Sequence, residues 1–313
     1  MNVKIIKALS RSGYIHSKTH LFPDYIVEPS VTQPGIKNML NTLQIPWEDI
    51  AEIREEKSKL SDMGDEKIKY ADQIASFNKR LRDETANCIK SDDDFPIMVG
   101  GDHSSAIGSI AGVLQKRKNA GVLWVDAHSD LHTYETTETG WIYGMPAAVV
   151  CGHGHPKLVD IMQGNYVKPE NLCLFGVRYA EAGELRNMKE WGVHMVTIDQ
   201  IDELGIYEAY KKAMNYITKN TDYIHLSLDI DVVDKMYAPG ATEPTQGGLT
   251  FREINLVARR LGTSGLVKSM DLVEGEPDKD INYQTGKLCL QLTANILGKN
   301  YSEYDMYLSE NHI

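Results

Sequence analysis

The sequence predicts an α/β protein in which helices cover both faces of a mostly parallel β-sheet. Short apolar runs, typical of strands buried on both faces, alternate with segments of helical periodicity along most of the 313 residues. Repeated strand–helix–strand units favour parallel pairing through crossover helices. No Pro- or Ser-rich linker interrupts the alternation, which favours one domain over residues 1–313.

The N-terminal part of the chain carries the weakest signals. We expect a first strand at residues 3–6 and an edge strand within residues 45–53. The segment between them contains Pro23, Pro29 and Pro34, and is expected to be irregular apart from a short helix over residues 34–40. Apolar residues recur at loosely helical spacing over residues 65–89, which predicts a long amphipathic helix.

From residue 95 onward the alternation becomes regular. Apolar runs predict six more strands, at residues 95–99, 122–125, 172–177, 193–198, 224–229 and 266–272. Helical patterns between or after them lie at residues 104–117, from about 145, and at 182–191, 206–217, 250–261 and 284–297. A polar loop is expected at residues 131–143, and the polar and aromatic tail at 301–313 either packs against a neighbouring subunit or is loose.

Composition narrows the classes of partner. The chain has 33 basic and 44 acidic residues, a formal net charge of −11, which argues against nucleic acid or an anionic membrane surface as the partner. No apolar run approaches the length of a membrane span, and residue 1 opens no signal-peptide pattern. The four cysteines are too far apart to form the close pairs of zinc sites, so we expect buried free thiols and a reducing, cytoplasmic setting.

The strand at residues 122–125 is followed by three side chains suited to binding a metal. Asp126, His128 and Asp130 are spaced two apart, so in extended chain they point the same way. They lie at the carboxyl end of a parallel strand, which is where such sheets usually bind ligands. The alternative is an ordinary capped strand end, since Asp and Ser are common there.

Two further strand ends carry similar residues. Gly100 and Gly101 allow a sharp turn that brings His103 to the same edge, and Asp229 and Asp231 end another apolar run. So many carboxylates together are costly unless a cation lies among them. Oxygen and imidazole ligands without thiolates indicate two Mn²⁺ ions, with Fe, Co or Zn as alternatives. Two such ions can activate a shared water, which predicts metal-assisted hydrolysis.

These residues resemble the signatures of the ureohydrolases, the arginase and agmatinase family. The signatures are Gly-Gly-Asp-His-Ser at 100–104, Asp-Ala-His-Ser-Asp at 126–130 and Ser-Leu-Asp-Ile-Asp at 227–231, and segments 238–244, 247–253 and 270–274 support them. The resemblance covers about residues 95–297. It implies a three-layer α/β/α sandwich with an eight-stranded sheet, a dinuclear manganese centre, a small guanidino substrate and a homotrimer or homohexamer.

The resemblance also implies roles for individual residues. It places one ion on His103, Asp126, Asp130 and Asp229, and the second on His128, Asp126, Asp229 and Asp231. A hydroxide between the ions would attack the guanidinium carbon, which Glu274 would orient. We therefore assign Asp130, Glu274 and Tyr143 to catalysis. Asp271, which lies inside the predicted strand at residues 266–272, is instead expected to support the metal ligands without binding an ion itself.

The expected substrate shell departs from the arginase pattern. Tyr143 stands where arginases have a His credited with proton shuttling, and His132 stands where they have an Asn that binds the substrate carboxylate. Thr137 and Thr139 keep hydroxyl groups, and Trp141 is bulkier than the usual residue. The predicted substrate contacts are His132, Thr137, Thr139, Trp141, Glu181 and Glu274.

Three hypotheses follow. The first is arginine hydrolysis, with His132, His153 or His155 delivering the proton. The second is hydrolysis of another guanidino or amidino compound, such as agmatine, a guanidino acid or formiminoglutamate. The third is a metal-binding relative without turnover. Metal-dependent deacetylases share the fold, but six ligands for two ions argue against them.

Overall fold

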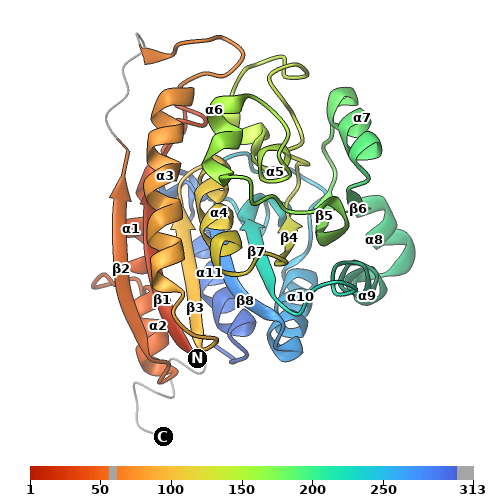
Figure 1. Cartoon of the computed structure of the whole chain (residues 1–313). Coiled ribbons are helices and arrows are strands. Elements are labelled where there is room, and N and C mark those ends of the chain that lie inside the picture. Colours follow the sequence, from red (N-terminus) through yellow and green to blue (C-terminus); the bar gives the residue numbers. More distant parts are fainter. Residues whose placement is uncertain (56–61, 302–313) are drawn as a thin grey trace, which may run out of the picture.

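The computed structural model describes residues 1–55 and 62–301 and contains an eight-stranded parallel sheet (Figure 1). Neighbouring strands follow the order β2-β1-β3-β8-β7-β4-β5-β6, and each pairing between them is parallel. The strands are β1 (Asn2–Leu9), β2 (Trp47–Arg54), β3 (Asp94–Gly100), β4 (Gly121–Val125), β5 (Leu172–Val177), β6 (His194–Thr197), β7 (Ile224–Asp229) and β8 (Val267–Val273). The expected tail, from residue 302 onward, lies outside the described residues.

Helices cover both faces of the sheet, which confirms the three-layer α/β/α prediction. One face packs against α3 (Ala71–Cys88), α4 (Ala106–Lys116), α5 (Pro146–Val150), α6 (Pro156–Val159) and α7 (Ala182–Trp191). The other packs against α1 (Phe22–Val27), α2 (Ile36–Thr42), α8 (Ile198–Leu204), α9 (Ile206–Ile217), α10 (Phe251–Ser264) and α11 (Gln284–Ile296). In Figure 1, α3 and α4 lie in front of the sheet, and α10 and α11 behind it.

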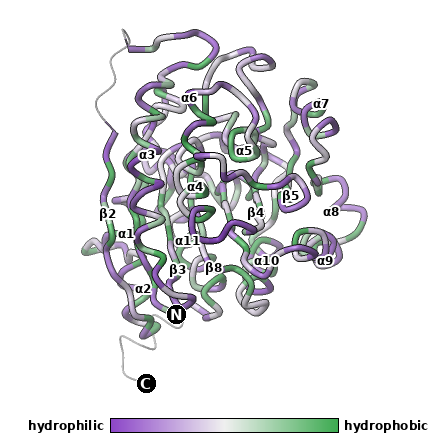
Figure 2. The backbone as a smooth tube through the Cα atoms, in the orientation of Figure 1, coloured by the Kyte–Doolittle hydropathy of each residue, from purple (hydrophilic) through white to green (hydrophobic). Residues whose placement is uncertain are grey.

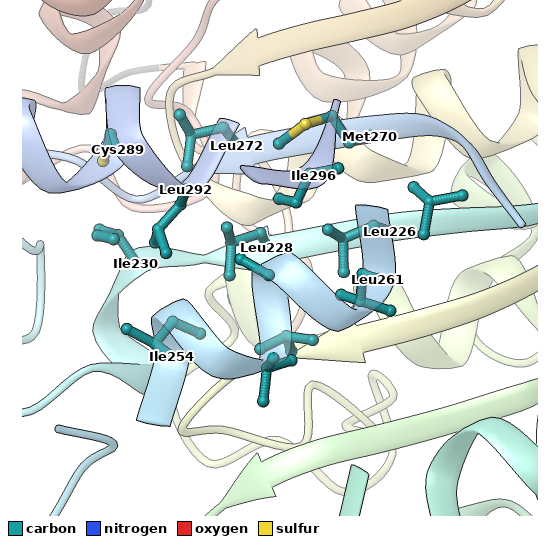
Figure 3. Packing of buried hydrophobic residues seen from close by; sticks show 14 of the residues in the cluster. Leu226, Leu228, Ile230, Ile254, Leu261, Met270, Leu272, Cys289, Leu292 and Ile296 are labelled. Atoms are coloured by element: carbon teal, nitrogen blue, oxygen red, sulfur yellow. The ribbon is translucent and has the colours of Figure 1, made fainter. Parts of the chain in front are cut away.

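Two separate cores hold the layers together, one on each face of the sheet. Along β4, Leu123 and Val125 belong to one core, whereas Val122 and Trp124 belong to the other. This alternation explains why a central parallel strand reads as a continuous apolar run. Figure 3 shows Leu226 and Leu228 of β7 beside α10 in the core that α10 and α11 complete. On α3, hydrophilic and hydrophobic residues alternate, as expected for a helix with one buried side (Figure 2).

The structure confirms the predicted strands and longer helices but corrects the short elements. The segment expected to be irregular contains α1, with Pro23 in its first turn, where the missing N–H breaks no helical hydrogen bond. The predicted strand over residues 193–198 ends at Thr197, because the Thr197 side chain accepts a hydrogen bond from Gln200 N and starts α8. All four cysteines are free and buried, as expected.

Candidate metal centre

Four neighbouring strands bring the predicted ligands to one edge of the sheet. Strands β3, β8, β7 and β4 are consecutive in the sheet, so their carboxyl ends meet. His103 lies just after β3, Asp229 ends β7, and Glu274 directly follows β8. Glu274 is a predicted substrate contact, whereas the remaining predicted ligands follow β4 and β7 within a few residues, and they are Asp126, His128, Asp130 and Asp231.

His103 is the centre of the first group. Its Nδ1 atom lies 3.0 Å from Asp126 Oδ2, 3.3 Å from Asp130 Oδ2 and 3.2 Å from Asp229 Oδ2. All four side chains are buried. Ligand atoms of His103, Asp126 and Asp229 are close enough together to hold one metal ion. Three residues of the first predicted ligand set thus form one group, and the fourth, Asp130, lies beside the same His103 atom.

His128 is the centre of the second group. Its Nδ1 atom lies 3.0 Å from Asp231 Oδ2 and 3.6 Å from Asp126 Oδ1, and these three residues could hold a second ion. Asp126 thus presents one carboxylate oxygen to each histidine. A carboxylate in this position can bridge two ions, as the sequence resemblance implies for Asp126.

Backbone and side-chain hydrogen bonds fix the orientation of the carboxylates. Asp126 Oδ1 accepts from His128 N at 2.6 Å, and Asp229 Oδ1 accepts from Asp231 N at 2.8 Å. Trp124 donates its indole N–H to Asp126 Oδ2 at 3.0 Å and stacks on the His103 ring, with centroids 4.1 Å apart. These contacts restrain the side chains that could hold the ions.

The charge of the group calls for cations. Burial, followed by the neighbouring carboxylates, raises the pKa of Asp130 and of Asp229 well above the usual range. Burial opposes protonation of His103, but the surrounding carboxylates outweigh it and raise its pKa to about 9. Among the described residues, His103 Nδ1 and Asp130 Oδ2 have no hydrogen-bond partner. Divalent cations would satisfy both atoms and allow the carboxylates to stay ionised, so the donor set fits two such ions.

Unusual backbone conformations position two of the carboxylates. Asp130 and Glu274 adopt φ angles of 51° and 61°, which are uncommon for residues other than glycine. Glu274 also accepts a hydrogen bond from His103 N at 2.7 Å. Strain of this kind often marks functional sites, because the surrounding structure must hold it in place.

The turn after β3 needs a glycine at position 101. Its N–H donates to Ala8 O at 3.0 Å and its carbonyl accepts from Glu274 N at 2.9 Å. A Cβ atom there would lie 1.7 Å from Ser10 O. The close approach of three chain segments therefore depends on Gly101, as the Gly-Gly turn suggested.

A small pocket opens onto the two groups. It is lined by His103, His128, Asp130, Tyr143, Asp229, Asp231, Thr242, Glu243 and Glu274. Glu243 was not among the predicted site residues, although it lies within the 238–244 segment that supports the resemblance. The Tyr143 hydroxyl donates to Glu243 Oε1 at 3.0 Å. Burial, then Glu243, raises the pKa of Tyr143, so the hydroxyl keeps its proton.

Of the predicted substrate contacts, only Glu274 lines this pocket, beside Tyr143. His132 Nε2 lies 3.2 Å from Glu181 Oε2, and Thr137 Oγ1 accepts from Gly140 N at 2.9 Å. Thr139 Oγ1 accepts from Trp141 N at 3.3 Å. These contacts lie within the loop or between it and α7. They give the residues structural partners without bringing them to the pocket described here.

Trp141 belongs to an aromatic cluster that contacts the pocket residue Tyr143. Its ring lies edge-on to Tyr14 and His16, at centroid distances of 5.5 Å and 5.3 Å, and is stacked on Tyr70 at 6.2 Å. Tyr14 in turn stacks on Tyr143 at 5.0 Å. Trp141 therefore supports Tyr143 through Tyr14. The N-terminal loop, whose role the sequence did not reveal, thus contacts a residue that lines the pocket.

Asp271 lies inside the sheet and contacts other partners. Its carboxylate accepts from Ser109 Oγ at 2.6 Å and 2.7 Å and lies 3.0 Å from His225 Nε2. In the part of the chain that the structure describes, no contact joins Asp271 to the six predicted ligands.

Within residues 1–55 and 62–301, no helix is long and apolar enough to cross a membrane.

Comparison with known proteins identifies the family. The arginase family model matches residues 31–298. The arginase of Bacillus subtilis is 37% identical over 253 residues, which are 80% of this chain and 84% of that protein. The arginase of Bacillus caldovelox is 35% identical over 269 residues, which are 85% and 89% of the two chains.

Solved structures agree with this assignment. The structure of the Bacillus caldovelox arginase has a TM-score of 0.88 at 32% identity and covers 96% of this chain and 99% of its own. A formimidoylglutamase from Bacillus subtilis has a TM-score of 0.72 at 20% identity, over 98% and 87% of the two chains, and so shows the fold alone. Sequence, fold and the paired histidine and carboxylate groups lead to one conclusion: the chain belongs to the arginase family.

Proposed function

We propose that this protein hydrolyses a guanidino substrate and releases urea, using two Mn²⁺ ions. The observation that carries the proposal is the sharing of Asp126 between His103 and His128. In the proposed centre, His103, Asp126, Asp130 and Asp229 hold one ion, and His128, Asp126, Asp229 and Asp231 hold the other. Two ions held by these residues would supply Lewis acidity and would lower the pKa of bound water, which is the chemistry that hydrolysis at neutral pH requires.

Glu274 has the chemistry needed to hold the substrate. Its Oε1 atom is occupied by His103 N, whereas Oε2 is buried and has no hydrogen-bond partner among the described residues. A guanidinium group offers a planar set of N–H donors that a carboxylate can accept. We assign Glu274 to orienting this group, and Asp130 to assisting catalysis from its place beside the first ion.

Arginine is the first substrate to test, because the curated relatives at 37% and 35% identity are arginases. A second candidate is a different guanidino or amidino compound. Tyr143 favours it, because a hydroxyl whose pKa is raised and whose proton is bound by Glu243 is a poor proton shuttle. The third candidate, metal binding without turnover, predicts no product from any such compound.

The test is a substrate panel after Mn²⁺ loading. Urea, ammonia and, for formiminoglutamate, formamide are measured over arginine, agmatine, guanidinobutyrate, formiminoglutamate and guanidine, with protein of known metal content. We expect urea from at least one guanidino compound and expect arginine to lead. Turnover of another member in its place would favour the second candidate. Fully loaded protein that releases no urea, ammonia or formamide from any member would refute the proposal.

A matched variant separates the first two candidates. If arginine is the substrate, Tyr143→His introduces a group that titrates near neutral pH, and at saturating Mn²⁺ we expect urea release from arginine to rise about tenfold or more. An unchanged or lower rate with arginine, alongside strong activity on another member of the panel, would favour the second candidate.

Assembly and location complete the proposal. We propose a homotrimer or homohexamer in the cytoplasm, on the basis of the sequence resemblance and the free cysteines. Light scattering of the metal-loaded protein measures the assembly directly. A monomer at micromolar concentration would contradict this part of the proposal and leave the hydrolytic part intact.

A further inference from the structure

A chain of contacts joins Tyr143 to the metal ligand His128 through Glu243. The Tyr143 hydroxyl donates to Glu243 Oε1 at 3.0 Å. The other oxygen, Glu243 Oε2, lies 3.6 Å from His128 Nε2, within ion-pair distance. The two contacts use different oxygens, so one carboxylate can serve both neighbours at once.

The chemistry of a metal-binding histidine explains why His128 needs such a neighbour. His128 Nδ1 points to Asp126 and Asp231, the side on which the second ion would bind. An imidazole that binds a metal through Nδ1 carries its proton on Nε2. An acceptor for that proton fixes the ring and makes the imidazole a better ligand. Glu243 Oε2 lies on that side of the ring.

The loop that carries Glu243 is anchored to the site on both sides. The preceding residue, Thr242, donates through its N–H and its hydroxyl to Glu274 O, at 2.8 Å and 2.9 Å. Lys279 Nζ donates to Thr242 O at 2.5 Å. On the other side, Tyr143 is held by the stacked ring of Tyr14. Glu243 is 37% exposed, so these neighbours, rather than burial, limit where its carboxylate can lie.

We propose that Glu243 is a positioning residue that orients His128 toward the second metal ion, and that Tyr143 holds Glu243 in place. Tyr143 then has a structural reason to be a tyrosine: its hydroxyl is a donor to a carboxylate, not a proton shuttle. The inference rests on the proposed two-ion centre and deepens it, because it assigns this role to the second ion alone. The first group, around His103, has no contact with Glu243 within the described residues.

The test is calorimetric titration of the metal-free protein with Mn²⁺, combined with steady-state kinetics on the best substrate of the panel. For Glu243→Ala we expect the dissociation constant of the second ion to rise about 10- to 100-fold, with the first ion unchanged. Tyr143→Phe should give a smaller rise of the same kind. At saturating Mn²⁺, kcat of Glu243→Ala should recover toward the wild-type value. Glu203→Gln, a change at an exposed carboxylate on α8, is the control and should change neither ion.

Two results would overturn the inference. One is Glu243→Ala binding both ions as tightly as wild type. The other is an increase in KM that excess Mn²⁺ does not reverse, with both dissociation constants unchanged, which would make Glu243 a substrate contact. Wild-type protein that binds only one ion would instead refute the two-ion centre itself. Thermal unfolding of the Mn²⁺-free variants shows that each one is folded before titration.

Discussion

Asp126 contacts the histidines of both halves of the proposed centre. It offers one oxygen to His103 and the other to His128. We therefore expect Asp126→Ala to lose both ions and to reduce activity to background, since a bridging ligand has no substitute nearby. Asp229→Ala should behave in the same way. Metal analysis after gel filtration measures the occupancy, and Asp199→Ala, on the exposed side of α8, is the control. Two ions retained by either ligand variant would contradict the assignment.

The six predicted ligands could be located in the sequence because each lies at or shortly after the end of an apolar strand. The extended geometry expected for their side chains is wrong in part: Asp130 has a φ angle of 51°, and His103 and Asp231 lie in short 3₁₀ turns, so turn geometry orients these three side chains. Glu243 could not be predicted in this way, since it lies in an irregular loop where no period orients the side chains. Trp141 shows the same limit: its loop position suggested a substrate contact, but it packs against Tyr14, a residue far away in the sequence.

At the scale of elements, the predictions succeeded where an element is long or fully buried. Apolar runs such as residues 172–177 can bury both faces only inside a covered sheet, and β5 occupies that range in the structure. Helices α1 and α8 were missed because six or seven residues hold less than two helical turns, too few to show a 3.6-residue period. Capping contacts and packing, which depend on the tertiary structure, determine these short helices.

Lys7 links three elements near the edge of the sheet and gives a stability prediction. Lys7 lies in β1, and its Nζ atom is 2.8 Å from Asp24 Oδ1, 3.1 Å from Glu28 Oε1 and 2.7 Å from Glu52 Oε2. Asp24 lies in α1, Glu28 directly follows α1, and Glu52 lies in β2. Lys7→Met leaves three carboxylates without this cation. We expect the free energy of unfolding to fall by about 1–3 kcal/mol at pH 7, a range reduced because the carboxylates are partly exposed.

The pH dependence of this loss has a definite sign. Burial raises the pKa of Glu28, but the hydrogen bonds from Lys37 and Lys7 outweigh burial, so the pKa is lowered. The pKa of Glu52 is lowered chiefly by its hydrogen bond from Lys7. A carboxyl group whose pKa is lowered in the folded state stabilises the fold at pH values above its ordinary pKa of 4.5. This contribution disappears as the pH falls through the lowered pKa. The difference between wild type and Lys7→Met in urea unfolding should therefore be smaller at pH 4 than at pH 7. A constant difference would contradict this explanation; Lys118→Met, at an exposed lysine, is the control.

At the scale of the whole molecule, the topology determines why one chain can build this site. In the sheet, two positions separate β3 from β4, although these strands are consecutive in the sequence. Strands β8 and β7, which come later in the sequence, occupy these two positions. Residues that are far apart in the sequence, such as His103 and Asp229, thereby come to neighbouring strand ends. The sequence showed that strand ends carried ligands. The order of the strands, which no local pattern encodes, was needed to show that these ends meet.

The concentration of carboxylates at this edge makes the stability of the whole molecule depend on metal and pH together. In metal-free protein, burial and nearby carboxylates raise the pKa of Glu274 to about 8, and those of Asp130 and Asp229 well above the usual range. The folded state then holds protons that the unfolded chain has already released, so stability falls as the pH rises above about 4.5. The raised pKa of His103, about 9, acts in the same direction, because its contribution is complete below pH 6.5 and is lost as the pH rises through 9.

We therefore expect Tm of EDTA-treated protein to fall between pH 6.5 and 8.5. Protein saturated with Mn²⁺ should change much less over the same range, because the ions, in place of protons, balance the ionised carboxylates. The gap between the two melting curves should widen with pH, and differential scanning calorimetry at pH 6.5, 7.5 and 8.5 measures it. Asp126→Ala provides the control, since EDTA should not shift its Tm at any pH if both ions are already lost. Parallel pH dependence with and without Mn²⁺ would mean that this carboxylate cluster does not control the stability of the fold.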